Sequence, residues 1–212
     1  MENLKKLMML LACMGIVATF TSCLSDDDDD KDANILTPAQ KSAQIFEMAG
    51  TYNGFVYTTS DKTMKPDSIA CTWHVSATDS VLTIPNFPVA MLANGINDSI
   101  ARKNLLKAVG VTFKGSLHPY YNNNHTKGYY TFWLLANDDK MEFTIEDEGE
   151  SHNVKVGLAY QMYVNASLGN AVVYSVGEYM SDQMLSYILV KDVAIDNKTF
   201  TTYWPLYIYG KK

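Results

Sequence analysis

The sequence predicts a mainly β protein: a single antiparallel β-barrel or β-sandwich of about nine strands, with an N-terminal helix and one inserted helix. Three observations support this class. Most of the chain after residue 50 consists of short runs in which apolar and polar residues alternate, separated by segments rich in turn residues. Two windows show helical spacing instead. The 212 residues are enough for one domain behind an N-terminal leader.

The first helix is expected over residues 38–48. Thr37 can cap its amino end, Pro38 suits the first turn, and Gln40 can reach back to the cap. Gly50 follows the apolar face of this window and is a natural stop.

The second helix is expected from about residue 98 to residue 109. Asn97 or Asp98 can cap it, and Gly110 ends it. Its expected buried stripe consists of Ile100, Leu105, Leu106 and Val109.

The remaining apolar runs predict strands. We expect them over residues 50–58, 68–76, 80–84, 111–118, 129–136, 141–145, 154–164, 171–176, 187–195 and 199–209. The run 154–164 alternates most cleanly and predicts one continuous strand. Asp196, Asn197 and Lys198 predict a hairpin turn between the last two strands. These patterns do not separate a barrel from a sandwich.

The start of the chain is typical of a secretory signal peptide. Lys5 and Lys6 precede an apolar stretch over residues 7–20, which is shorter than the roughly 20 residues that a membrane-spanning helix needs. Small residues then precede Cys23. We therefore divide the chain into a lipoprotein signal peptide (1–22), a lipidated acidic tether (23–36) and a mainly β domain (37–212).

The lipid assignment comes from a resemblance. The segment Phe20-Thr21-Ser22-Cys23 resembles a bacterial lipobox, in which the cysteine is lipidated and the chain is cut just before it. The acidic run behind Ser25 resembles the export signal of surface lipoproteins in Bacteroidetes; it consists of Asp26, Asp27, Asp28, Asp29 and Asp30. Together they imply a lipid on Cys23, an anchor in the outer membrane and display on the cell surface. Cleavage by an ordinary signal peptidase, which would leave Cys23 free, is the alternative.

Two further resemblances concern the domain. Its first strand opens with Gly50-Thr51-Tyr52-Asn53-Gly54, which resembles the opening of calycin-like barrels among Bacteroidetes lipoproteins. The chain as a whole is similar to lipoprotein families of unknown function from these bacteria. That resemblance implies a location and no activity.

Charge argues against a nucleic-acid partner. The net charge is −6, but residues 24–36 alone contain six aspartates and one lysine, so the domain is close to neutral. Its only arginine is Arg102. Nucleic-acid binding needs a basic face, and the sequence shows none. Cys71 is the single cysteine of the domain and is expected to be a small buried hydrophobe.

The sequence shows no motif for catalysis, for a metal or for a cofactor, so we expect a protein that is not an enzyme. None of the histidines stands at a metal-ligand spacing; they are His74, His118, His125 and His152. Carboxylates gather at two expected turns, around Asp138 and Asp147. Adjacent acids in a turn point into water, whereas a glycosidase needs two that face each other. Calcium at one of these turns is a minor alternative.

Tyrosines give the best candidate for a binding surface. In the last expected strand, Tyr203, Tyr207 and Tyr209 share one face, and the face with Leu206 and Ile208 is expected in the core. An exposed line of tyrosines can stack on sugar rings or anchor a protein partner. The alternative is a sheet that is covered on both faces. Pro205 predicts an edge strand or a bulge, and Tyr120 with Tyr121 invites the same binding hypothesis.

Three short motifs predict modification. Each is an Asp-Ser-aliphatic triplet that resembles the acceptor of O-glycosylation in Bacteroidetes, which implies Ser68, Ser80 and Ser99 as sites. At Ser99 the neighbouring Asp98 has a rival role as a helix cap.

The leading hypothesis is therefore a lipid-anchored surface protein that binds a glycan or a surface protein partner without catalysis. The alternative is a calycin-like barrel that carries an apolar small molecule in its interior. An enzyme that assembles residues such as His74 and His118 from distant strands ranks third.

Overall fold

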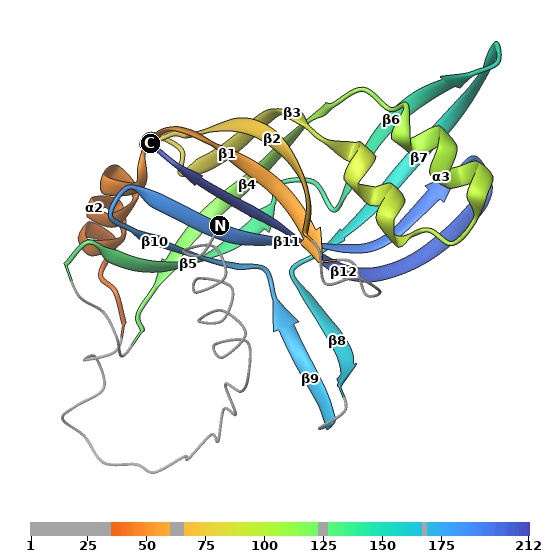
Figure 1. Ribbon diagram of the computed structural model, residues 1–212. Helices are drawn as coiled ribbons and strands as arrows, with labels where there is room; N and C mark the ends of the chain where they lie inside the picture. The colour runs from red at the N-terminus through yellow and green to blue at the C-terminus, as the bar shows by residue number, and fades with distance from the viewer. Residues whose placement is uncertain (1–34, 60–65, 123–126, 167–168) are drawn as a thin grey trace.

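The computed structural model of the chain describes residues 35–59, 66–122, 127–166 and 169–212. This part is mainly β: a closed barrel of eight antiparallel strands, with further strands on its outside and three helices (Figure 1). The helices are α2 (Pro38–Met48), η1 (Val89–Gly95) and α3 (Ser99–Leu106). The strands are β1 (Gly50–Thr59), β2 (Pro66–Val75), β3 (Val81–Phe87), β4 (Val111–Tyr120), β5 (Tyr129–Ala136), β6 (Lys140–Asp147), β7 (Glu150–Ala159), β8 (Gln161–Ala166), β9 (Gly169–Tyr174), β10 (Val176–Met180), β11 (Gln183–Ile195) and β12 (Lys198–Lys211).

The pairing order closes the sheet on itself, so the fold is a barrel and not a sandwich. Neighbouring strands follow the order β10-β5-β4-β3-β2-β1-β12-β11, and β10 also pairs with β11. β11 is long enough to serve two neighbours. Its segment Gln183–Ser186 pairs with β10, and its segment Leu189–Ile195 pairs with β7. β7 and β6 therefore continue the sheet beyond the barrel.

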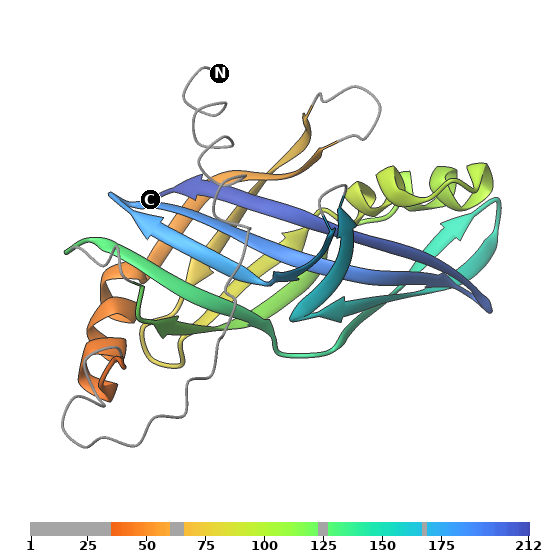
Figure 2. The same cartoon turned by 90° about the horizontal axis from the view of Figure 1, so that it is seen from below.

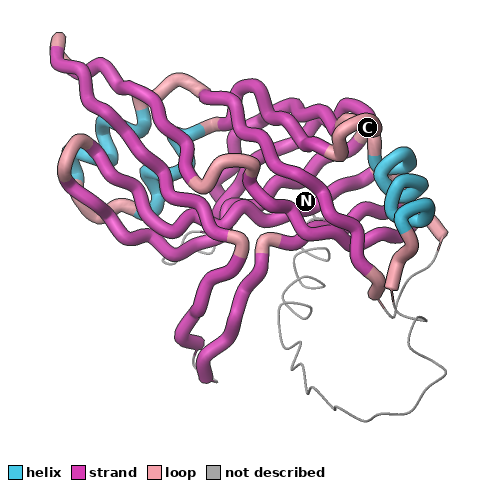
Figure 3. Tube along the Cα trace, turned by 180° about the vertical axis from the view of Figure 1, so that it is seen from behind, coloured by secondary structure: helices cyan, strands magenta, loops and turns pink. Residues whose placement is uncertain are grey.

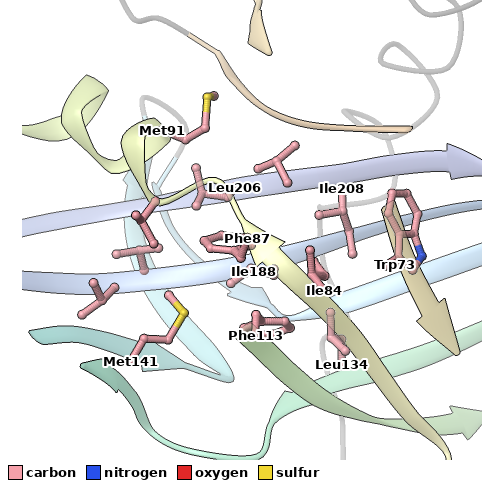
Figure 4. Close-up of a cluster of buried hydrophobic side chains, with 14 of the residues drawn as sticks. Trp73, Ile84, Phe87, Met91, Phe113, Leu134, Met141, Ile188, Leu206 and Ile208 are labelled. Atoms are coloured by element: carbon pink, nitrogen blue, oxygen red, sulfur yellow. The ribbon is translucent and has the colours of Figure 1, made fainter. Parts of the chain in front are cut away.

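Side chains from the inward faces of the strands fill the barrel. Alternate residues of a strand point inward, as in any closed barrel. Figure 4 shows Trp73, Ile84, Phe113 and Leu134 converging on residues of β11 and β12. Several of the largest side chains are fully buried: Tyr52, Trp73, Leu82, Ile84, Phe113, Phe132 and Leu134.

Helices cover the two ends (Figures 1 and 3). α2 buries Ile45 and Met48, and the hydroxyl of Tyr52 donates to the Met48 carbonyl at 2.5 Å. η1 and α3 lie at the other end, beside β6 and β7. There Phe87, Met91 and Met141 join the same core (Figure 4).

Local helix signals predicted α2 correctly. It spans residues 38–48, and the capping box is formed: Thr37 Oγ1 accepts from the Gln40 N–H at 3.3 Å, and Gln40 Oε1 accepts from the Thr37 N–H at 2.8 Å. The Asp196–Asn197 turn also joins β11 to β12 as predicted, with Ile195 paired to Lys198.

The expected single strand over residues 154–164 is wrong. The chain bends at Tyr160, so that β7 ends at Ala159 in the main sheet and β8 begins at Gln161 in a separate hairpin with β9. Figure 1 shows this hairpin standing away from the barrel, and in Figure 2, which is seen from below, the hairpin points toward the viewer. Alternation continues across the bend because both strands have a period of two, and nothing in that pattern marks a change of partner.

The expected buried stripe of the second helix is also wrong in part. α3 packs through Ala101, Asn104 and Leu105, which lie three and four residues apart on one face. Of the predicted stripe only Leu105 is buried, whereas Ile100, Leu106 and Val109 are exposed. The predicted cap is present: Asp98 Oδ1 accepts from the N–H groups of Ile100 and Ala101.

β12 is not an edge strand, since it pairs with β1 on one side and with β11 on the other. Its ladder with β1 ends at the Tyr57–Tyr207 pair, so Pro205 lies just beyond that ladder and opposite Leu189 of β11. A register shift between Val190 and Asp192 adjoins this position. The barrel thus accommodates a residue without an N–H at a position where β12 no longer pairs with β1.

Candidate binding site on the outer face of the barrel

Three tyrosines from three adjacent strands form the centre of the candidate site. Tyr187 on β11 stands opposite Tyr207 on β12, and Tyr207 stands opposite Tyr57 on β1. The ring of Tyr207 stacks on that of Tyr57, with 4.9 Å between centroids and 12° between planes. It meets Tyr187 edge-on at 5.0 Å and 70°. Tyr57 is buried, whereas Tyr187 and Tyr207 are half-buried.

A second row of the same face extends this group. Leu185 stands opposite Tyr209, which stands opposite Phe55. The Tyr209 hydroxyl donates to Gln183 Oε1 at 3.0 Å, which fixes the ring against β11. Phe55 is about half exposed, at 48%. We call the packed group of Tyr57, Leu185, Tyr187, Tyr207 and Tyr209 the outer tyrosine cluster.

Further aromatic rings lie along the same outer surface. The ring of Trp133 on β5 packs against the ring of Tyr120 on β4, with 5.1 Å between centroids. It also packs against the ring of Tyr174 at the end of β9, again with 5.1 Å between centroids. The neighbours of Trp133 along β5, Phe132 and Leu134, belong to the core, so Trp133 points outward. We call Tyr120, Trp133 and Tyr174 the outer tryptophan cluster.

β10 separates the two clusters and carries a carboxylate between them. Glu178 stands opposite Leu185 on one side and opposite Thr131 on the other. Burial raises the pKa of Glu178, and a hydrogen bond from the Tyr129 hydroxyl partly offsets this. Burial, and after it the Glu178 carboxylate, raise the pKa of Tyr129, so the phenol is the donor.

The site therefore offers aromatic faces, neutral hydroxyls and one acceptor of hydrogen bonds. Burial raises the pKa of Tyr57, Tyr187 and Tyr207 above that of a free phenol, so these hydroxyls stay protonated. Such a surface can stack on a flat ligand and exchange hydrogen bonds with its hydroxyl groups.

The structure brings together part of the predicted tyrosine line. Tyr207 and Tyr209 lie opposite the core face of Leu206 and Ile208, as the alternation indicated. They are half-buried against their neighbours, not fully exposed. Tyr203 belongs to β12, but its side chain lies outside the described residues.

Several members of the site were missed by sequence reasoning. Tyr57, Tyr187, Trp133 and Glu178 come from four strands that are distant in sequence. Each stands at an outward position of an alternating strand, which is a detectable signal. Only the register between strands places them side by side.

The other predicted sites are dispersed or lie outside the described part. Cys23 and the acidic run Asp26, Asp27, Asp28, Asp29 and Asp30 lie outside the described residues. Ser68 is exposed on β2, and Ser99 is exposed at the start of α3. Ser80 is half-buried in a turn with φ of 59°, and its carbonyl accepts from the Leu117 N–H.

The histidines and loop acids mostly have local partners. His74 Nδ1 lies 3.3 Å from Thr51 Oγ1, and His118 is exposed on β4. His125 lies outside the described residues. Asp147 pairs with Lys107 of α3. In the part of the chain that the structure describes, no group of three or more His, Cys, Asp or Glu side chains could hold a metal ion.

Cys71 packs against the core, and the described helices are short. Cys71 is partly buried against the core, and burial raises the pKa of its thiol to about 11. The thiol is therefore protonated at neutral pH. None of the helices described here has the length and apolar character needed to cross a membrane.

Comparison with known proteins gives one match. Residues 47–195 match a family described as a domain of unknown function, DUF4840. No curated protein and no solved structure matches the chain.

Proposed function

The chain belongs to the DUF4840 family, and we propose that its barrel binds a glycan or a surface protein partner, without catalysis, on the outer aromatic face. The observation that carries this proposal is the packed row of Tyr57, Tyr207 and Tyr187 across three strands. Rings held by neighbouring rings lose little conformational entropy when a ligand binds.

The chemistry of the face favours the glycan over the protein. Sugar rings present apolar C–H faces that pack on aromatic side chains, and their hydroxyls need both donors and acceptors. Tyr187 and Tyr207 supply donors, and Glu178 supplies an acceptor at the middle of the face. The rings lie in rows across adjacent strands, which suits an extended chain of sugars.

The location forms a second part of the proposal. A lipid on Cys23 and the aspartates Asp26 to Asp30 would hold the domain at the outer face of the outer membrane of a Bacteroidetes cell. A non-catalytic binding protein gains from such an anchor, because it keeps the captured glycan near the cell. Labelled fatty acid should enter the wild-type protein and not the Cys23→Ala variant.

Glycan-array binding of the full-length protein in detergent tests the binding proposal. Tyr207→Ala and Trp133→Ala should each lower the affinity for the best-bound glycan at least about tenfold, which corresponds to the loss of one good ring contact. Phe46→Ala removes an exposed ring on α2, at the end of the barrel, and should change nothing. Unchanged affinity in both outer-face variants would refute the assignment of the site.

A carrier of an apolar small molecule is the second candidate, because the barrel is closed. It ranks below surface binding since Trp73, Phe113 and Phe132 occupy the interior. A carrier must release a molecule on extraction with organic solvent, and mass spectrometry of such an extract from native protein would detect it.

A further inference from the structure

A hollow at the α3 end of the molecule shares no residue with the outer aromatic face. It lies between α3 and the turn that joins β11 to β12, and its volume is about 460 Å³. That volume is within the range of small-molecule sites. Ile195 and Ala101 form a buried part of its wall, and Phe200 and Ile100 add further apolar surface.

Two contacts between polar side chains join the walls of the hollow. Lys198 Nζ lies 2.5 Å from Asp98 Oδ2 and so joins β12 to the cap of α3. His152 Nδ1 lies 2.9 Å from Asp196 Oδ2 and so joins β7 to the turn. Above the pKa of His152, where its imidazole is neutral, these groups carry two negative charges and one positive charge. In that pH range the rim favours a cation.

A buried acceptor without a partner lies in the same wall. Asn104 lines the hollow and is only 3% exposed, and its Oδ1 atom has no hydrogen-bond partner among the described residues. An unpaired buried acceptor costs stability. A bound ligand with an N–H donor would satisfy it once the Asn104 amide turns toward the hollow.

We propose that the hollow lined by Ile100, Asn104, Lys198 and Phe200 binds a small organic amine with an apolar body. The amine donates to Asn104 Oδ1, the apolar body packs on Ile100 and Phe200, and the net negative rim stabilises the ammonium group. Ile100 is 70% exposed without a ligand, and such a ligand would cover it.

Binding of 2-phenylethylamine to the full-length protein, compared with the neutral 2-phenylethanol, tests this inference. Titration calorimetry at about pH 8 should show saturable binding of the amine below about 10 mM and at least about tenfold weaker binding of the alcohol. Asn104→Leu should weaken binding of the amine about tenfold and binding of the alcohol by less, because a charged donor gains more from this acceptor than a neutral hydroxyl does. Lys198→Gln makes the rim more negative and should raise the affinity for the amine at least about twofold.

Thermal unfolding separates a binding role of Asn104 from a structural one. Asn104→Leu should unfold at the same or a higher temperature, because it removes an acceptor that has no partner. Leu106→Ala, an exposed position of the same helix, is the matched control for both measurements. Three results would each overturn the inference: no saturable amine binding by the wild type, equal amine affinity in Asn104→Leu, or a lower unfolding temperature of that variant.

Discussion

β1 carries an aromatic pair on each side of the barrel wall, and the two pairs differ in exposure, not in geometry. Inside, Tyr52 stacks on Trp73 with 5.5 Å between centroids and 3° between planes. Outside, Tyr57 stacks on Tyr207 at 4.9 Å and 12°. Both inner rings are fully buried, whereas Tyr207 is half-buried. The inner pair can only stabilise the fold, while the outer group keeps surface that a ligand can cover.

The largest expected effect is on the inner pair. Trp73→Ala should lower the free energy of unfolding by about 3–5 kcal/mol, because it empties a fully buried position of a closed barrel. Urea titration measures this loss. Phe46→Ala, at a ring that is 75% exposed, should stay within about 0.5 kcal/mol of the wild type. If Trp73→Ala lowered the free energy of unfolding as little as the loss of an outer ring does, the inner and outer pairs would not differ in their contribution to stability.

The second effect separates stability from binding on the outer pair. Tyr207→Ala removes the ring between Tyr57 and Tyr187 and should cost about 1–3 kcal/mol, less than the inner variant. The same variant should lose glycan binding. Tyr207→Phe keeps the ring and should retain the stability, so any binding that it loses reports on the hydroxyl.

The contrast between the two faces also shows what a sequence can predict here. Tyr207 and Tyr209 were assigned opposite to Leu206 and Ile208 because a strand alternates with a period of two, which is local information. Tyr57 and Tyr187 were missed because their contact with Tyr207 depends on the register of β1 and β11. Register is set by the whole sheet and is absent from any single strand.

The two wrong element predictions have the same origin. At Tyr160 the alternation runs on while the strand partner changes from β11 to β9. At α3 the apolar residues Ile100 and Leu106 fit a helix but not the face that the rest of the fold offers. By contrast, α2 was predicted to the residue, because its capping box and the Gly50 stop are local signals that directly flank the helix.

A third, smaller effect should come from the carboxylate on the outer face. Burial raises the pKa of Glu178, so the folded state holds a proton over a pH range in which the unfolded state has lost it. The free energy of unfolding therefore falls as pH rises through this range and stays lower above it. Glu178→Gln should raise the unfolding temperature at about pH 7 and change little below about pH 4.

Such a result would mark Glu178 as a group that costs stability on the outer face, as expected of a ligand contact. The variant keeps an oxygen that can accept from Tyr129, so the gain is attributable to the charge. A loss of stability at neutral pH would instead make Glu178 part of the structural framework, like the inner rings.

The smallest effect belongs to a contact outside both faces, the exposed pair of His152 and Asp196. Hydrogen bonding to Asp196 raises the pKa of His152, so its contribution is present below the usual histidine pKa, about 6.5, and is lost as pH rises through the folded value. Hydrogen bonding to His152 lowers the pKa of Asp196, so that contribution is lost only as pH falls through the folded value of the acid.

The wild type should therefore unfold at a higher temperature than His152→Gln at about pH 5.5, and the difference should vanish at about pH 9. Introducing Asp196→Asn into both proteins should remove the pH dependence of that difference. An ion pair at the surface stabilises less than either stacked pair. An effect here as large as that of Tyr207→Ala would therefore show that the turn beside the hollow, and not the barrel wall, limits the stability of the domain.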